Sequence, residues 1–176
     1  MPALARRTRQ LIEAVFPGDP RPCADYAASR LAPALFELFR GMPVVDQRHG
    51  CRVAHELASR GWTSRAAAEA ALMHDVGKSC GAARVRVPDR LAVVILTGLV
   101  RGSLPPGIAR ASAALDAAVR HPAIGAACLR DRGADAYSTW LVANHQRRDL
   151  ADDPLLAALI AADDGTTPAA SARVLA

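Results

Sequence analysis

The segment Ser64–Lys78, SRAAAEAALMHDVGK, combines a strong helix pattern with two adjacent side chains of the kind that binds metal ions. Ser64 is a favourable N-cap, and the alanine-rich stretch after it has high helix propensity. We therefore predict a helix that follows Ser64, reaches Asp75 and stops at Gly77. An apolar face leads along this helix to His74 through Ala67, Ala70 and Ala71. Neighbouring helical residues point about 100° apart, so His74 and Asp75 converge on one ion only where the helix frays before Gly77.

Further helices are predicted on both sides of this segment, and no strand pattern interrupts them. Apolar residues recur at helical spacing, and glycine and proline residues separate the runs. The other predicted helices cover residues 3–16, 23–39, 44–59, 91–100, 108–120, 122–132, 134–145 and 154–163. Loops are expected at 78–88 and 102–107. The sequence therefore predicts an all-α fold.

Four of the predicted helices each place a metal-ligand type of side chain on the apolar stripe that should face the core. These side chains belong to His49, His74, His145 and Asp163. Each of them alone is more often a hydrogen-bonded core residue or a capping acid. Burial of an unpaired carboxylate is costly, and one shared metal would compensate all four groups. Imidazole and carboxylate ligands together suit Fe, Mn, Zn or Co better than Ca.

Five short motifs follow one another at helix-scale spacings. They are RHG at 48–50, HDVGK at 74–78, HPAIG at 121–125, NHQ at 144–146 and ADD at 162–164. In this order they resemble the HD superfamily of metal-dependent phosphohydrolases, and the resemblance spans residues 46–164. The helical insert after the second motif resembles small, stand-alone bacterial HD proteins. The ligand pattern is also similar to that of the diadenosine tetraphosphate hydrolases of the superfamily.

The resemblance implies an HD-domain helical bundle with the metal site at its centre. It also implies hydrolysis of a phosphomonoester or phosphodiester, usually of a nucleotide, by a metal-activated water. No GYP element follows the HDVGK motif, and Gln146 stands where the cyclic-di-GMP phosphodiesterases carry a second histidine. These two departures argue against cyclic-di-GMP as the substrate.

The resemblance also assigns roles to residues. It implies one or two divalent metals, with Fe, Mn, Zn, Co and Ni as candidates and Mg as an alternative. The ligands of the first metal would be His49, His74, Asp75 and Asp163. His121 and His145 match the ligands of a second metal, with Asp75 as the bridge. Lys78 matches a lysine that contacts substrate phosphate, so Asp75 and Lys78 are the expected catalytic residues.

Three arginines near the motifs are further candidates for binding substrate phosphate, because guanidinium groups pair well with phosphate oxygens. They are Arg48, Arg147 and Arg148. Arg147 and Arg148 follow His145, and they are equally well interpreted as solvent-exposed residues at a helix end. The expected organisation is a pair of N-terminal helices that pack on the core, an HD domain and a flexible tail, at residues 1–40, 41–165 and 166–176.

The composition fits a globular protein with a basic surface. The chain has 176 residues, 51% of them hydrophobic, and a formal net charge of +5. Lys78 is the sole lysine, so arginine carries the basic charge. Four scattered cysteines form no CxxC pair, and we expect buried thiols of a cytoplasmic protein rather than a disulfide framework. We expect no signal peptide and no transmembrane segment, since the apolar run 91–100 is too short to span a bilayer.

Two other classes of function compete with a phosphohydrolase. The first is a non-catalytic HD module that binds a nucleotide and regulates a partner; the complete ligand set argues against it. The second is a nucleic-acid-binding protein, suggested by the basic charge, but the chain lacks a pattern of interleaved aromatic and basic residues. The substrate, the metal, the role of residues 91–100 and a homodimeric state stay open.

Overall fold

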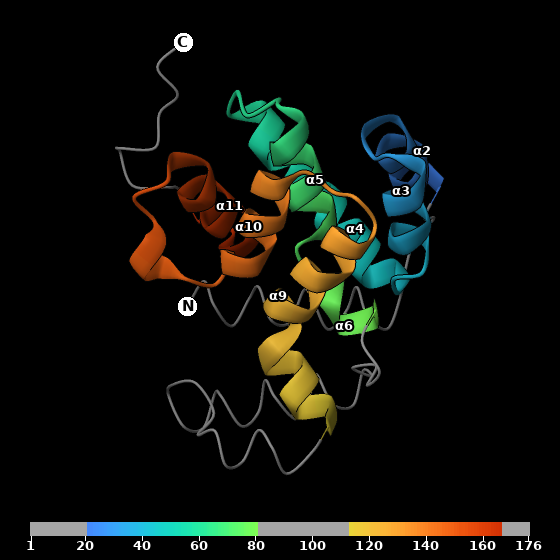
Figure 1. The fold of residues 1–176 in the computed structure, drawn as a ribbon. Helices are drawn as coiled ribbons and strands as arrows, with labels where there is room; N and C mark the ends of the chain where they lie inside the picture. Colours follow the sequence, from blue (N-terminus) through green and yellow to red (C-terminus); the bar gives the residue numbers. More distant parts are fainter. Residues whose placement is uncertain (1–20, 81–112, 167–176) are drawn as a thin grey trace.

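A computed structural model describes residues 21–80 and 113–166, and these residues form helices and no strands (Figure 1). The α-helices are α2 (Arg21–Arg30), α3 (Pro33–Arg40), α4 (Val44–Ser59), α5 (Arg65–Met73), α6 (Gly77–Cys80), α9 (Ala113–Asp131), α10 (Ala136–Asn144) and α11 (Pro154–Asp164). A 3-10 helix, η1 (Arg148–Leu150), lies before α11. The predicted all-α fold is confirmed for these parts of the chain.

Helix α5 lies in the middle of the bundle, where it contacts α2, α4, α10 and α11 (Figure 1). It begins as predicted, because the Ser64 hydroxyl accepts a hydrogen bond of 3.2 Å from the backbone N–H of Ala67. Residues 67–73 are all buried. On α4, a Cβ added at Gly50 would stand 2.7 Å from the carbonyl oxygen of Leu72. The two helices therefore touch backbone to backbone, which brings their side chains into one core.

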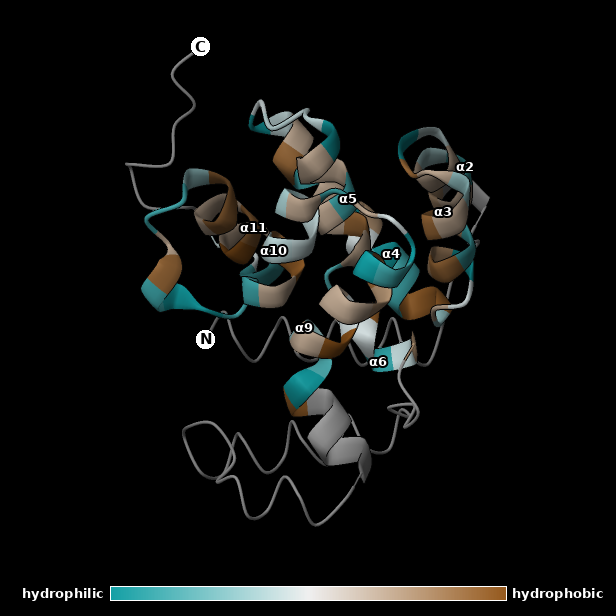
Figure 2. Ribbon diagram, in the orientation of Figure 1, coloured by the Kyte–Doolittle hydropathy of each residue, from teal (hydrophilic) through white to brown (hydrophobic). Residues whose placement is uncertain are grey.

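Helix α11 is hydrophobic along most of its length (Figure 2). A helix that is apolar on every side is stable only when it is buried, and its residues 155, 156 and 158–162 are buried. The Asp153 carboxylate caps the helix by accepting a hydrogen bond of 2.8 Å from the N–H of Leu156. Gly165, with a φ of 64°, ends it in the left-handed conformation that favours glycine. The helix predicted at 154–163 is thus confirmed.

Two predicted element boundaries within residues 21–80 are wrong. The single helix expected over 23–39 is divided into α2 and α3, because a proline disfavours helical geometry in the residue before it. Ala32, which precedes Pro33, is accordingly extended, with a φ of −62° and a ψ of 152°. The loop expected from residue 78 onward begins instead with α6. Fully buried Val76 and the close approach of Gly77 to α9 hold this short helix in place.

Residues 113–131, which we expected to be divided between two helices at 108–120 and 122–132, form one continuous helix, α9. Pro122, predicted as the first residue of a new helix, lies inside it. A proline within a helix costs about 3 kcal/mol, since it removes a backbone hydrogen bond and crowds the preceding turn. Both Pro122 and His121 before it are buried, and α9 packs against α6 and α10. These tertiary contacts offset the local cost.

Several predictions fall outside the residues that the structure describes. They are the helices at 3–16 and 91–100, most of the loop at 78–88, the loop at 102–107 and the tail after 166. Within residues 21–80 and 113–166, none of the helices has the length and apolar character needed to cross a membrane.

The four cysteines are paired as two disulfides, so the expectation of free thiols is wrong. Cys23 bonds to Cys51 and joins α2 to α4, with Cα atoms 5.9 Å apart. Cys80 bonds to Cys128 and joins α6 to α9, with Cα atoms 6.7 Å apart. Both separations lie within the usual range for disulfides. The partners are 28 and 48 residues apart in sequence, a pairing that motif spacing does not reveal.

Reduction of the disulfides is expected to destabilise the fold. Cross-links over loops of this length typically contribute about 2–4 kcal/mol each by restricting the unfolded chain. Thermal unfolding with and without a reductant measures the effect, and a Cys23→Ala/Cys51→Ala variant separates one bridge from the other. Thiol titration of the denatured, unreduced protein should find none of the four cysteines free. Four reactive thiols would contradict the pairing.

Candidate metal centre

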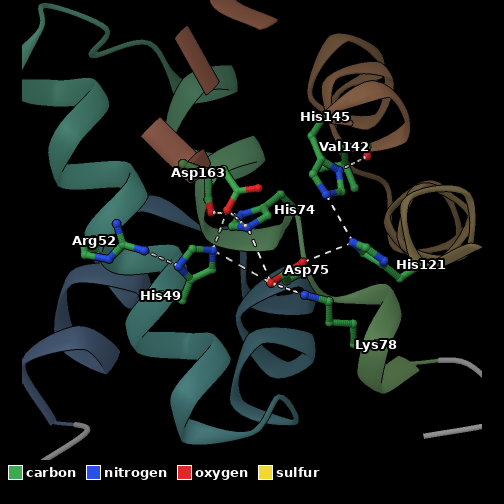
Figure 3. A network of polar contacts seen from close by, with 10 residues as sticks. His49, Arg52, His74, Asp75, Lys78, His121, Val142, His145 and Asp163 are labelled. Atoms are coloured by element: carbon green, nitrogen blue, oxygen red, sulfur yellow. Dashed lines mark hydrogen bonds and ion pairs between the residues drawn. The ribbon is translucent and has the colours of Figure 1, made fainter. Parts of the chain in front are cut away.

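All six side chains predicted as metal ligands lie together inside the bundle (Figure 3). They form two triads, in each of which one ligand atom per residue lies within 4.8 Å of the others. Triad A consists of His49, His74 and Asp163; triad B consists of Asp75, His121 and His145. His74, Asp75, His121 and His145 are at most 5% exposed. Residues up to 114 positions apart in sequence thus meet at one place.

Three of these ligands lie at the C-terminal ends of helices. His74 is the C-cap of α5, His145 is the C-cap of α10, and Asp163 is in the last turn of α11. The backbone carbonyls at a helix C-terminus carry partial negative charge, which favours a nearby cation. Helix α5 also ends at Met73, so His74 and Asp75 lie in the turn before α6 and both face the centre. The predicted fraying before Gly77 is therefore observed.

The His74 ring shows that triad A suits a cation. Its Nδ1 lies 2.8 Å from the carbonyl oxygen of Ala71, which only accepts, so Nδ1 carries the proton and Nε2 carries a lone pair. This buried Nε2 has no hydrogen-bond partner among the described residues. It lies 3.7 Å from Asp163 Oδ1 and 3.6 Å from Asp75 Oδ2. Electron pairs that face one another without a proton between them are the arrangement that a metal ion satisfies.

Triad B has the same character. His145 Nδ1 donates a hydrogen bond of 2.8 Å to the carbonyl of Val142, which leaves the Nε2 lone pair facing the triad. Burial, with smaller contributions from His74 and His121, lowers the pKa of His145 to about 3. His145 is therefore neutral at physiological pH, as a metal ligand must be. His121 Nε2 lies 3.2 Å from His145 Nε2 and 3.2 Å from Asp75 Oδ1.

Asp75 divides its two oxygens between the triads. Oδ1 faces His121, whereas Oδ2 lies 3.6 Å from His74 Nε2 and 4.0 Å from His49 Nε2. Burial alone would raise the pKa of this carboxyl, but the Lys78 ammonium and the neighbouring histidines hold it well below its ordinary value. Asp75 is thus ionised, and each of its two oxygens faces one of the triads. The donor set of imidazole nitrogens and carboxylate oxygens fits a divalent transition metal.

The predicted phosphate-binding residues are in different surroundings. Lys78 Nζ lies 2.6 Å from Asp75 Oδ2 and is 23% exposed, so it borders the centre and reaches solvent. Arg48 is exposed on α4. Arg147 forms a bidentate pair with Asp149, and Arg148 pairs with Asp164. Among these four basic side chains, Lys78 is the one with a described contact to a residue of the two triads.

Arg52 is a functional candidate that the motifs did not indicate. Its Nη2 atom lies 2.6 Å from His49 Nδ1. The sequence spacing indicated this contact. Residues three apart on a helix are neighbours on its surface, and Arg52 follows His49 by three positions on α4. Figure 3 shows Arg52 on the side of the His49 ring that faces away from Asp75.

A surface pocket of about 410 Å³ lies beside α6. Its walls are Glu37, Leu38, Gly41, Val76, Ser79, Cys80 and Arg132. None of these residues belongs to either triad. The pocket is therefore not assigned to the metal centre.

Comparison of the chain with protein-family models, with curated proteins and with solved structures finds no significant match. The case for the site therefore rests on the residues and their geometry. That geometry is a buried centre of four histidines and two aspartates in two triads that share the Asp75 carboxylate.

Proposed function

We propose that the protein is a metal-dependent phosphohydrolase of the HD type, which acts on a nucleotide or another small phosphate ester. One observation carries the proposal: two triads of histidine and aspartate ligand atoms lie next to each other inside the bundle. The buried His74 Nε2 among them has no hydrogen-bond partner in the described residues, and such a group is costly to bury unless an ion compensates it. The order of the five motifs supports the same assignment.

Bound divalent metals would supply a water of lowered pKa and would neutralise charge on the phosphoryl oxygens. Triad A with Asp75 would hold the first ion, and triad B with the same carboxylate would hold the second. Hydrogen bonds to backbone carbonyls orient His74 and His145 with Nε2 toward the centre. Asp75 would contribute one oxygen to each ion, and the buried helices exclude bulk water.

Lys78 is the protein group best placed to recognise phosphate. Its ammonium lies beside the bridging carboxylate and is partly open to solvent. Once metal charge compensates Asp75, the ammonium can turn toward a non-bridging phosphate oxygen. Arg48, Arg147 and Arg148 would add phosphate contacts only after rearrangement. We therefore assign phosphate binding first to Lys78.

Metal binding is expected to raise thermal stability. At a free metal concentration 100 times the dissociation constant, binding contributes about 2.7 kcal/mol, a rise of roughly 5–10 °C in a domain of this size. Differential scanning fluorimetry with Mn²⁺, Co²⁺, Ni²⁺, Zn²⁺ or Mg²⁺, before and after chelation, measures it. His121→Ala should reduce the rise. His55→Ala is the matched control, because His55 is exposed and belongs to neither triad.

Activity is tested by metal analysis of the purified protein followed by assay on nucleotides and an aryl phosphate. The proposal expects release of phosphate or a nucleoside monophosphate that a chelator abolishes and added metal restores. Tight nucleotide binding by calorimetry without turnover would favour a regulatory module instead. Absence of both metal and turnover would contradict the proposal.

The cytoplasmic location expected from the sequence is a proposal that the two disulfides weigh against. Disulfides are rare in the cytosol, and the structure pairs all four cysteines. The redox state of the cysteines in protein taken directly from its native cells therefore tests the location. Reduced thiols would support a cytoplasmic protein, and intact disulfides would point to an oxidising compartment.

A further inference from the structure

His49 differs from His74 and His145 in the group that its Nδ1 atom faces. Nδ1 of His74 and of His145 each faces a backbone carbonyl oxygen at 2.8 Å, which is a pure acceptor. Nδ1 of His49 faces the Arg52 guanidinium at 2.6 Å, which is a pure donor. The same ring position therefore carries a proton in His74 and His145 and a lone pair in His49.

The position of the proton on His49 follows from this contact. Nδ1 must accept the hydrogen bond from Arg52, so the single ring proton of neutral His49 lies on Nε2. Asp163 Oδ1 stands 2.8 Å from that Nε2 and accepts its hydrogen bond. A doubly protonated ring would place two donors against each other at 2.6 Å. The nitrogen that points toward triad A is thus occupied by a proton and is unavailable to a metal.

We propose that Arg52 is a positioning residue that holds His49 in its non-ligating tautomer and thereby weakens metal binding at triad A. The inference rests on the proposed metal centre. Metal binding at Nε2 requires the proton to move to Nδ1, which needs an acceptor rather than a guanidinium beside it. Arg52 must then turn away from the ring. In triad B, His145 already presents a lone pair on Nε2, because its Nδ1 proton is donated to the Val142 carbonyl.

Arg52 also links metal binding to phosphate binding. The guanidinium is half-buried on α4 at the edge of the centre, and it carries five N–H donors suited to a phosphate group. An oxyanion that draws Arg52 away from His49 removes the obstacle to the first metal. By linkage, metal at triad A would equally favour binding of the oxyanion.

Arg52→Gln tests the role of Arg52, because the glutamine amide oxygen can accept a hydrogen bond from Nδ1–H. Long-range ¹H–¹⁵N NMR spectra of the metal-free protein report the tautomer of each of the five histidines. The wild type should show His49 protonated on Nε2, and His74 and His145 protonated on Nδ1. Arg52→Gln should move the His49 proton to Nδ1. This readout needs neither metal nor activity, so it stands apart from the proposed function.

Calorimetric titration with Mn²⁺ or Co²⁺ provides the second readout. We expect two steps in the wild type, one of which Arg52→Gln tightens roughly 10–100-fold, the usual range for groups that orient a ligand. The other step should be unchanged. Arg130→Gln, which removes an exposed arginine on α9, controls for the lost charge, and Arg52→Leu serves if the glutamine variant fails to fold.

Each outcome bears on one proposal or the other. His49 protonated on Nδ1 in the wild type would overturn the role of Arg52, as would two metal-binding steps of which neither tightens in Arg52→Gln. The expected tautomers with no metal binding by either protein would uphold the hydrogen-bond assignment and contradict the metal centre. The expected shift in both readouts would support both.

Discussion

Asp75→Asn is expected to reduce kcat for phosphate-ester hydrolysis by about a thousandfold or more, equivalent to roughly 4 kcal/mol of transition-state stabilisation. The substitution keeps the shape of the side chain and removes its charge. The Asp75 carboxylate lies close to histidines of both triads, so an amide there should weaken both proposed metal positions together. Lys78 also loses its ion-pair partner at 2.6 Å. Steady-state kinetics with metal content measured on the same samples checks the effect.

The matched control is Asp131→Asn, which neutralises an exposed carboxylate at the end of α9. It should leave kcat, KM and metal content within experimental error of the wild type. Circular dichroism establishes that both variants are folded. An Asp75→Asn protein that keeps more than about a tenth of the wild-type activity would remove the bridging carboxylate from the mechanism.

Gly77→Ala is expected to be the most destabilising single methyl addition in the described core. A Cβ at Gly77 would stand 2.0 Å from the carbonyl oxygen of His121 and 2.6 Å from the backbone N of Gly125. Both neighbours are backbone atoms of α9, which move only if the helix moves. We expect a loss of about 3 kcal/mol in the free energy of unfolding, at the upper end of measured overpacking effects. Denaturant titration measures the loss.

Gly41→Ala is the control for the general effect of replacing glycine by alanine. Gly41 has a φ of −73°, which alanine adopts readily, and its added Cβ would meet nothing closer than 3.3 Å. Its stability should change by less than about 1 kcal/mol. Equal stability of the two variants would show that α6 and α9 do not approach as closely as described. Gly77→Ala should also weaken metal binding, because His121 and Asp75 flank the contact.

The ligand residues were predictable because each prediction used only local information. His49, His74, His145 and Asp163 continue apolar stripes on their helices, and a stripe with a period of 3.6 residues identifies the buried face of a helix. Helices α4, α5, α10 and α11 were predicted with nearly correct bounds, since their caps, glycines and prolines lie in the sequence beside them. The motifs added His121 and the pairing of His74 with Asp75.

The errors occurred where contacts between distant residues outweighed local preference. Pro122 normally opens a helix, but packing against α6 and α10 carries α9 through it. The segment after Gly77 contains loop-forming residues, yet contact with α9 makes it helical. The disulfides join cysteines 28 and 48 residues apart, and no local pattern encodes such a pairing. Helical spacing could have predicted a contact between Arg52 and His49, but it does not indicate which ring nitrogen faces the guanidinium.

The sequence by itself determined that the chain forms helices and that histidine and aspartate side chains lie on their buried faces. Propensity, capping and periodicity act over a few residues, so a single chain segment carries that information. Only the tertiary structure decided that Asp75 gives one oxygen to each triad, that Gly77 brings α6 against α9 and that Arg52 occupies Nδ1 of His49. These features depend on the relative placement of whole helices, which the packing of the complete core sets.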